Sequence, residues 1–279
     1  MTLAGPLPTV ETGEVTVVVV TRDRPDRVRD TIPHHRAPVI VVDNGSRVPP
    51  PVDGARLIRL DTNLGAAARN IGVRQATTPF VAFADDDSYW APGSLARAAA
   101  LLRAHPRTAL LAAQVRVGTA GRLDPVSAGM AAAPLGTPPG GAGPSILGFL
   151  SCAVVVRRDA FLAAGGFQRR LFVYGEEALH AMDLAAAGWR LCYVPELVVH
   201  HFPDPAGRDP RARLRREARN RVLTALLRRP VRRVAGVVAA ELRADPLAVC
   251  GVLRDLPWAL RRRRRLPPEV ESALRVLGQ

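Results

Sequence analysis

Short apolar segments alternate with more polar segments along the first half of the chain. The most apolar of them, VTVVVV at residues 15–20, is β-branched and has no polar alternation, which is typical of a strand covered on both faces. Further apolar segments lie at 39–42, 57–60, 80–84 and 109–115. Segments compatible with helices lie between them, at 25–32, 65–75 and 93–104. This alternation predicts parallel βαβ units and therefore an α/β fold.

The pattern becomes less regular in the second half. Residues 118–145 are rich in Gly, Pro and Ala, which predicts a long loop of the kind that can act as a flap over a site. The apolar segment 146–156 predicts renewed order. Two helices are then expected near 159–164 and 176–187, and two short strands at 190–194 and 197–200.

Three regions follow from this pattern. Residues 1–14 form a leader without periodicity, 15–204 form one α/β domain, and 205–279 form an Arg-rich helical extension interrupted by prolines. The leader has no basic segment followed by an apolar one, so we expect no signal peptide. No apolar segment approaches the roughly 18–20 residues that a membrane-spanning helix needs.

Charge is distributed unevenly between these regions. The chain has 39 basic residues, all of them arginine, 25 acidic residues and a net charge of +14. Residues 205–279 contain 19 Arg and 7 acidic residues, and so carry +12 of that charge. A nearly neutral body with a basic extension suits an anionic partner, such as a membrane surface, a nucleic acid or a phosphorylated substrate.

The cysteines indicate a compartment. Cys152, Cys192 and Cys250 are few, odd in number and without CxxC spacing. This pattern argues against a disulfide framework or a zinc site and favours a reducing cytosol. We therefore expect a cytoplasmic protein, either free or peripheral on the inner face of the membrane.

Three consecutive carboxylates, Asp85, Asp86 and Asp87, follow the buried segment 80–84. In an extended chain alternate side chains share a face, so Asp85 and Asp87 can converge while Asp86 points elsewhere. Such carboxylates repel each other, and a Mg²⁺ or Mn²⁺ ion that also binds phosphate oxygens would remove the repulsion. The alternative is a solvated acidic turn that caps the next helix. The position after a buried strand favours metal binding, because ligands bind at the carboxyl ends of parallel strands.

Two other polar segments occupy comparable positions. Asp43 follows the segment 39–42, and its carboxylate could accept the N3–H of a uracil or thymine ring; a plain Asn-Gly turn is the alternative. The segment NLGAAARN, residues 63–70, opens a helix with small residues that let a ligand approach closely, and its Arg69 could face a phosphate. Ordinary close packing of the helix is the alternative there.

Together these segments resemble a known family. VTVVVVTRDRP, VVDNGS, NLGAAARNIG, VAFADDDS and GGF…YGEEALHAMDLAAAGWRLCYVPELVVHH look, in order and spacing, like the family 2 glycosyltransferases, the inverting enzymes of the GT-A fold. The later segments look most like a bacterial rhamnosyltransferase branch. The resemblance covers about residues 15–202 and includes the RNR at 219–221. It implies a GT-A (Rossmann-like nucleotide-binding) mixed sheet flanked by helices over 15–204, with a basic α-helical C-terminal extension.

The resemblance also implies a donor site. Asp43 would contact the nucleotide base, Asp85 would lie near the ribose or the metal, and Asp87 would bind the divalent cation that bridges the diphosphate. We assign further donor-binding roles to Thr21, Asn63, Gly65, Arg69, Asn70 and Asp86.

The catalytic base of the family is the second acid of a pair that opens a helix. The pair reads Glu176-Glu177 here, so the base maps to Glu177 and both acids are candidate catalytic residues. A carboxylate there would take the proton of an acceptor hydroxyl as it attacks the anomeric carbon. Acids favoured by the helix dipole are the alternative. The pair departs from the usual Glu-Asp, and Asp183 stands where branch members often carry an arginine.

The segment VVHH, residues 198–201, matches a region where some relatives place a histidine near the metal or diphosphate. His200 or His201 could serve as a metal ligand. Because side chains alternate along a strand, only one of the two can face the site. An edge-strand histidine in contact with solvent is the alternative.

The arginines of the extension lie among Leu, Val and Ala at rough helical spacing over 208–233, and 261–265 is an unbroken arginine run. A basic amphipathic helix can lie on an anionic membrane, which suits an enzyme with a lipid-linked acceptor. A solvated helical face, or a tail that packs partly on the body, is the alternative. The extension lacks stacking aromatics and groove-reading motifs, so we expect no nucleic-acid binding.

The sequence therefore predicts a metal-dependent inverting glycosyltransferase. It would move a sugar from a nucleoside-diphosphate sugar, a dTDP- or UDP-sugar, to a hydroxyl of a glycan, a lipid-linked saccharide or a secondary metabolite. The rival classes are a nucleotidyltransferase, a non-catalytic nucleotide- or saccharide-binding protein with a degenerate site, and an Arg-rich adaptor. The first normally has a Gly-rich triphosphate loop, which TRDRP at 21–25 lacks, and the acidic triplet argues against the other two.

Overall fold

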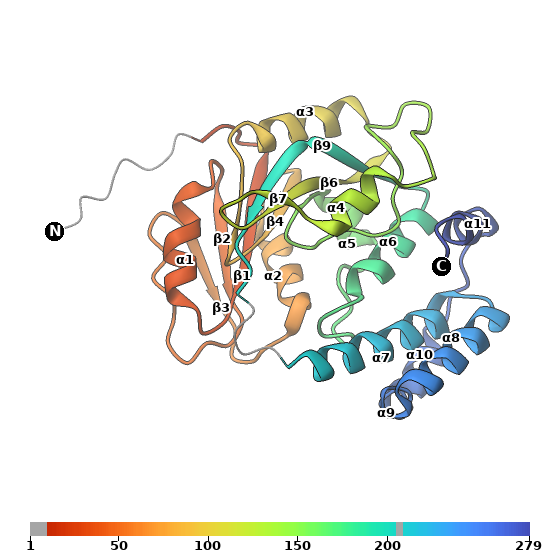
Figure 1. Ribbon diagram of the computed structural model, residues 1–279. Coiled ribbons are helices and arrows are strands. Elements are labelled where there is room, and N and C mark those ends of the chain that lie inside the picture. The colour runs from red at the N-terminus through yellow and green to blue at the C-terminus, as the bar shows by residue number, and fades with distance from the viewer. Residues whose placement is uncertain (1–9, 205–208) are drawn as a thin grey trace.

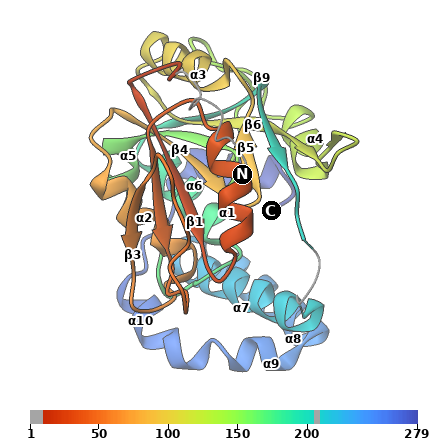
Figure 2. The ribbon, with the colours of Figure 1, turned by 90° about the vertical axis from the view of Figure 1, so that its left-hand side faces the viewer.

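The computed structural model describes residues 10–204 and 209–279 (Figure 1). Residues 1–9 of the expected leader and residues 205–208, at the start of the expected extension, lie outside the described part. The sheet and the helices around it form an α/β body, and a layer of helices from the last third of the chain packs along one side of this body (Figures 1 and 2).

Nine strands of the described chain form a single mixed sheet. Its order is β3-β2-β1-β4-β8-β6-β9-β5, and β7 pairs with β6. The strands are β1 Val15–Thr21, β2 Val39–Asp43, β3 Arg56–Arg59, β4 Phe80–Asp85, β5 Ser88–Trp90, β6 Thr108–Val117, β7 Arg122–Leu123, β8 Val154–Arg157 and β9 Arg190–His201.

Helices flank the sheet and form the C-terminal layer. The α-helices of the described chain are α1 Pro25–Thr31, α2 Ala68–Gln75, α3 Ser94–Ala104, α4 Pro125–Ala131, α5 Arg158–Ala163, α6 Glu176–Ala186, α7 Pro210–Arg228, α8 Val231–Ala244, α9 Pro246–Cys250, α10 Leu256–Arg261 and α11 Pro268–Val276. Three 3₁₀ turns accompany them: η1 Ile32–His34, η2 Gly65–Ala67 and η3 Leu253–Asp255.

The first four strands have the parallel arrangement that their apolar pattern predicts. β1 pairs in parallel with β2 and β4, and β2 pairs in parallel with β3. Val17 and Val19 of β1 lie in the core on one face of the sheet, whereas Val18 lies in the core on the other face. Because both faces are covered, the strand carries no polar alternation. The carboxyl ends of β1, β2 and β4 meet at one edge of the sheet.

The second half of the sheet mixes strand directions. β8 runs antiparallel to its neighbours β4 and β6, while β9 runs parallel to β6 and antiparallel to β5. β9 is one continuous strand where the sequence predicts two, because an irregularity in its pairing with β6, between Val194 and Val198, absorbs the polar interruption. Its last residues therefore reach β5 and the acidic turn, with His201 opposite Ser88.

The expectation of a structureless loop over 118–145 is wrong in part. This segment contains β7 and α4. Asp124 caps α4 by accepting a hydrogen bond from the Val126 amide, and the buried Ser127 hydroxyl accepts one from the Val115 amide of β6. The Gly and Pro content predicts a loop, but the segment includes a short helix that is hydrogen-bonded to the sheet through Ser127.

The C-terminal helices are packed against the body. Leu223 and Leu227 of α7 share a buried cluster with Leu179 of α6, and Leu274 of α11 packs with Met182 of α6. Prolines occupy the first turn of α7, α9, α10 and α11, where they interrupt no internal hydrogen bond. No helix in the described part of the chain is long and apolar enough to cross a membrane.

Candidate functional site

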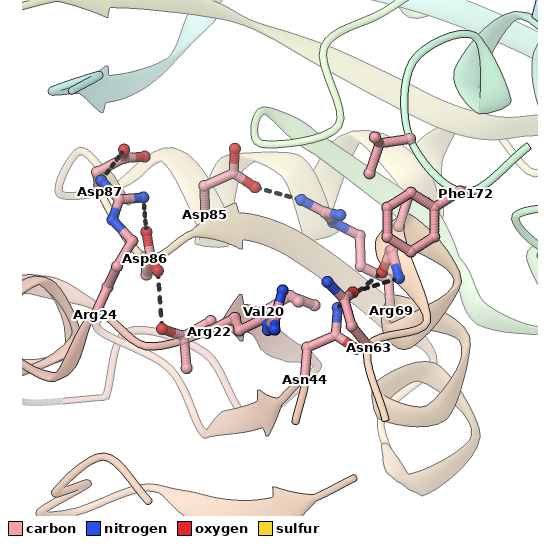
Figure 3. A pocket seen from close by; sticks show the side chains of 14 residues that line it. Val20, Arg22, Arg24, Asn44, Asn63, Arg69, Asp85, Asp86, Asp87 and Phe172 are labelled. Atoms are coloured by element: carbon pink, nitrogen blue, oxygen red, sulfur yellow. Dashed lines mark hydrogen bonds and ion pairs between the residues drawn. The ribbon is translucent and has the colours of Figure 1, made fainter. Parts of the chain in front are cut away.

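A cavity of about 280 Å³ opens at the carboxyl ends of β1 and β4 (Figure 3). Ligands of open α/β sheets bind at this edge. Its walls come from the two strand ends, from the turns after β2 and β4, and from the start of the small-residue helix. The lining residues are Val20, Thr21, Arg22, Arg24, Asn44, Asn63, Gly65, Ala66, Arg69, Asp85, Asp86, Asp87, Phe172 and Val173.

The three aspartates line this cavity together. β4 ends at Asp85, and Asp86 and Asp87 form the turn into β5, so strand alternation does not separate them. The Arg24 guanidinium donates to Asp86 at 2.6 Å and to Asp87 at 2.9 Å (Figure 3). Thr21 donates its hydroxyl to Asp86 at 2.8 Å. The expectation that Asp86 points elsewhere is therefore wrong.

Burial and charge act in opposite directions on these carboxyls. Burial raises the pKa of Asp86 to about 6, although the charge of Arg24 and the hydrogen bond from Thr21 lower it. Burial also acts to raise the pKa of Asp87, but hydrogen bonds from His201 and Arg24 outweigh it and hold that pKa below its ordinary value. The charge of this acidic turn is thus partly neutralised by the Arg24 guanidinium.

The two histidines at the end of β9 face different ways. His201 places Nε2 3.3 Å from Oδ1 of Asp87. His200 packs its ring against Tyr89, with the centroids 5.2 Å apart. Burial lowers the pKa of His201, but the hydrogen bond to Asp87 and the charge of Asp85 outweigh it, so the pKa is raised. The structure brings His201, and not His200, to the acidic turn.

The residues around Asp85 fit a divalent cation. Ligand atoms of Asp85, His201 and Cys152 lie within 4.8 Å of one another. A carboxylate and an imidazole are ligands that Mn²⁺ accepts, and phosphate oxygens of a bound substrate can complete such a shell. Asp87 already uses one oxygen toward Arg24 and the other toward His201. Asp85 is thus the carboxylate better placed to hold a metal.

Arg69 of α2 crosses the floor of the cavity. It is 7% exposed and donates from Nη2 to Oδ1 of Asp85. Its Nε has no hydrogen-bond partner among the described residues. A buried guanidinium with an unused donor at a cavity wall suits an anionic group such as phosphate.

Asn63 and Gly65 shape the far wall. Asn63 accepts hydrogen bonds through Oδ1 from the side chain of Asn44 at 2.9 Å and from the Gly65 amide at 2.8 Å. Gly65 has φ of +62°, and a Cβ there would lie 2.2 Å from the carbonyl oxygen of Phe172. Only glycine lets the loop 171–175 approach this closely.

Two predicted donor-binding residues do not line the cavity. Asp43 is fully buried; its Oδ1 accepts from the Ser46 amide at 2.9 Å, and its Oδ2 lies 3.6 Å from Nε of Arg59. The side-chain amide of Asn70 donates to the carbonyl of Phe167 at 2.8 Å and accepts from its amide at 2.9 Å. Asn70 therefore holds the GGF segment to α2, which is a structural role.

A larger cavity of about 620 Å³ adjoins the first. Both are lined by Ala66, Arg69, Asp85 and Val173, so the two spaces meet beside the acidic turn. The walls of the larger cavity come from the segment before β8, the start of α6, the end of β9 and one face of α7. Its other lining residues are Phe149, Leu150, Ser151, Cys152, Tyr174, Gly175, Glu176, Glu177, His201, Arg213, Glu217 and Arg221.

The acidic pair at the start of α6 faces the larger cavity. Glu177 accepts a hydrogen bond through Oε1 from the Ser151 hydroxyl at 2.6 Å. Glu176 is 4% exposed, and its Oε2 has no partner among the described residues. Burial, followed by the charge of Glu177, raises the pKa of Glu176 to about 8. Near neutral pH Glu176 therefore retains its proton, while the neighbouring Glu177 carboxyl is held by the Ser151 hydroxyl.

Several site residues escaped the sequence reasoning. Arg24 lies in the TRDRP segment, which directly follows a central strand. That position could have indicated that Arg24 lies at the ligand-binding edge of the sheet. Ser151 stands in an apolar segment that gave no sign of a polar contact. On α7, Arg213, Glu217 and Arg221 line the larger cavity, and apart from the RNR at 219–221 no local pattern says that a helix so far along the chain borders the site.

Comparisons with known proteins agree with this geometry. The sequence pattern of Glycosyl transferase family 2 matches residues 14–162. A segment of 70 residues is 43% identical to N-acetylglucosaminyl-diphospho-decaprenol L-rhamnosyltransferase of Mycobacterium tuberculosis. That segment covers 24% of this chain and only 23% of the relative.

Solved structures show the same fold. The mannosyltransferase PcManGT of Pyrobaculum calidifontis, in complex with GDP-Man and Mn²⁺, superimposes with a TM-score of 0.55 at 20% identity, over 99% of this chain and 79% of that one. TarS 1-349 of S. aureus, in complex with UDP-GlcNAc, gives 0.56 at 15% identity, over 93% and 83%.

The match to the family pattern extends over more than half of the chain, from the first strand to α5. The mixed sheet flanked by helices matches that of the GT-A neighbours, so the predicted GT-A fold is confirmed. This chain belongs to glycosyl transferase family 2.

Proposed function

We propose that the protein transfers a sugar from a nucleoside-diphosphate sugar to an acceptor hydroxyl, with inversion at the anomeric carbon. The observation that carries this proposal is the meeting of the two cavities at Asp85 and Arg69. One cavity has the charged groups that a metal–diphosphate needs, and the other has the Glu177 carboxyl group, aligned by the Ser151 hydroxyl. An inverting transferase must place its leaving group and its acceptor on opposite sides of one carbon, and this arrangement allows that.

The smaller cavity would bind the donor. Asp85 and His201 would hold a Mg²⁺ or Mn²⁺ ion, with Cys152 beside them and Asp87 orienting the imidazole. Such a cation neutralises the charge that develops on the leaving diphosphate. Arg69 and Arg24 would add hydrogen bonds to phosphate oxygens. Thr21, Asn63 and Gly65 would shape the wall, while Asp86 would hold Thr21 and Arg24 in place.

The larger cavity would bind the acceptor. Glu177 would accept the proton of the attacking hydroxyl, and the hydrogen bond from Ser151 would fix the orientation of that carboxylate. Glu176, protonated near neutral pH, would place no second negative charge beside Glu177.

The partners follow from the same site. One solved neighbour is in complex with UDP-GlcNAc, and another is in complex with GDP-Man and Mn²⁺. The Mycobacterium tuberculosis relative is named for a rhamnosyl transfer to a diphospho-decaprenol saccharide. We propose a dTDP- or UDP-sugar as donor and a glycan or lipid-linked saccharide as acceptor. A cytoplasmic location, peripheral on the inner face of the membrane through the basic extension, fits such an acceptor.

Thermal unfolding with UDP, dTDP, GDP or CDP, each with and without Mn²⁺, tests the donor half. A ligand at about 100 times its Kd should stabilise by about 2.7 kcal/mol, a shift of several degrees. We expect one nucleoside diphosphate to act only with the metal, and Asp85→Asn to abolish its effect. Asp159→Asn, at an exposed carboxylate of α5, is the control. A non-catalytic binding protein would give the same shift without releasing nucleoside diphosphate from the matching sugar donor.

A further inference from the structure

A third cavity, of about 420 Å³, lies between α6, α7 and α8. We call it the side cavity. Its apolar wall is formed by Ala178, Met182, Ala225, Val237 and Ala240. The volume is within the range of about 300–1,000 Å³ found for small-molecule sites. The donor and acceptor roles proposed above make no use of this space.

The side cavity adjoins the proposed acceptor cavity. Gly175 and Arg221 line both spaces, so the two are neighbours beside the loop that leads into Glu176 and Glu177. A molecule with its reacting hydroxyl at Glu177 would reach the side cavity by passing the Arg221 side chain.

The charged groups at the side cavity are paired. Arg221 donates to Glu241 at 2.6 Å, and Arg229 donates to Glu271 at 2.8 Å. Each pair neutralises its own charge, and most of the lining surface between the pairs is apolar. An uncharged hydrocarbon chain asks only for apolar contact, and the alanine, valine and methionine side chains supply it.

Basic side chains of α7 lie over aromatic residues of the loop 171–175. Arg213 lies over the ring of Tyr174 and Arg216 over the ring of Phe172, each with its guanidinium carbon 5.0 Å from the ring centroid. Arg213 lines the acceptor cavity beside Arg221 and donates to Glu217 at 2.7 Å. Guanidinium groups retain unused N–H donors even when one side is paired, so these side chains suit a phosphate.

We infer that the side cavity binds the hydrocarbon chain of a lipid-linked acceptor. The order of groups along the path carries this inference: the carboxylate of Glu177 for the sugar hydroxyl, Arg213 and Arg221 for the linking phosphates, then an apolar space for the chain. A polyprenyl-diphosphate saccharide has its sugar, phosphates and hydrocarbon in that order. The inference rests on the proposed function, because it takes the larger cavity as the acceptor site.

Prenyl diphosphates of increasing length test the inference on the full chain. Isothermal titration with isopentenyl, geranyl and farnesyl diphosphate would measure affinity against chain length. Each buried methylene strengthens binding, so farnesyl diphosphate should bind about tenfold or more tighter than isopentenyl diphosphate. Ala240→Trp adds bulk at an exposed position of the lining and should weaken this dependence. Ala235→Trp is the matched control, since Ala235 is also an exposed alanine of the same helix but does not line the cavity.

Equal affinities for the short and long chains would overturn the inference, as would equal losses in the two tryptophan variants. Nucleoside diphosphate binding with Mn²⁺, measured on the same preparations, separates the two proposals. If the nucleotide binds and affinity does not depend on chain length, only the side-cavity inference fails. If affinity rises with chain length as expected but no nucleotide binds, the inference is supported and the proposed transfer fails.

Discussion

Asn220 on α7 donates its side-chain amide to the carbonyl oxygen of Tyr174 at 2.7 Å. The same amide reaches the carbonyls of Leu171 at 2.8 Å and Val173 at 3.0 Å. Tyr174 has φ of +71° and is followed by Gly175 at +90°, a conformation that side chains disfavour. A fully buried residue of the C-terminal helices therefore holds the strained loop that positions the acidic pair of α6.

Asn220→Asp is expected to lower kcat by about tenfold or more, with a smaller loss of donor binding because Phe172 and Val173 of the same loop line the donor cavity. The carboxylate has the shape of the amide but donates no hydrogen bond, so the three carbonyls lose their partner and the loop can relax. Stability should fall by about 1–3 kcal/mol, as for other buried polar groups left unpaired. Steady-state kinetics and nucleotide titration measure the two effects separately.

Val222→Ala is the control for that experiment. Val222 is a buried residue of the same helix with no hydrogen bond to the loop, and its truncation costs stability through a cavity alone. If Val222→Ala is destabilised as much as Asn220→Asp but keeps a normal kcat, the loss of kcat in Asn220→Asp comes from the loop that Asn220 positions. Equal losses of kcat in both variants would mean that Asn220 acts only through overall stability.

Gly65→Ala is expected to destabilise the protein and to weaken nucleotide binding. A Cβ at this position would meet the Phe172 carbonyl at 2.2 Å, so the wall of the donor cavity must move. Gly136 also has φ of +62°, yet nothing lies within 4 Å of a Cβ placed there. Gly136→Ala therefore incurs only the backbone cost, about 1–2 kcal/mol. Thermal melts with and without nucleotide should show an additional loss in Gly65→Ala alone.

The sequence predicted the parallel half of the sheet well because its signal there is local. VTVVVV leaves no polar face and can only be a covered strand, and the acidic triplet after 80–84 marks the ligand-binding edge. The same local reasoning was wrong for Asp86, because it extended strand geometry through residues that form a turn.

Contacts between distant segments could not be predicted in this way. The family resemblance implies a donor role for Asn70, whereas its partner is the backbone of Phe167, 97 residues away. The alternative that the extension packs partly on the body is the one the structure supports, but no local pattern predicts that α7 forms a wall of the proposed acceptor cavity or that Asn220 fixes its loop. Its arginines also pair with acids that lie far off in the sequence, as Arg228 does with Asp183.

Stability is expected to fall as pH rises toward 8, and Glu176→Gln should reduce this effect. The folded pKa of Glu176 lies near 8 against an ordinary value of 4.5, so between these values the folded state holds a proton that the unfolded state has lost. The unfolded state then binds fewer protons, and the free energy of unfolding decreases by up to about 1.4 kcal/mol per pH unit. Below the unfolded pKa Glu176 is protonated in both states, so this pH dependence disappears and the full stability is present.

Thermal melts of the wild type and the variant from about pH 5 to 8 would measure the effect. The glutamine cannot ionise, so the variant should gain stability relative to the wild type as the pH rises. Asp159→Asn, at an exposed carboxylate, should leave the wild-type slope in place. Parallel curves for Glu176→Gln and the wild type would show that Glu176 is ionised in the folded protein at neutral pH.

The two adjacent histidines of β9 give a matched test of the metal site. His201→Gln should raise the Mn²⁺ concentration needed for half-maximal nucleotide binding by about tenfold or more, because it removes the imidazole that we propose as a metal ligand and that Asp87 orients. His200→Gln changes the neighbouring residue, whose ring packs on Tyr89 away from the acidic turn, and should leave the Mn²⁺ requirement unchanged. Manganese titrations at fixed nucleotide, followed by thermal shift, compare the two. If the Mn²⁺ requirement is unchanged in His201→Gln, or increases equally in both variants, His201 is not a metal ligand and Asp85 has no imidazole partner in the metal site.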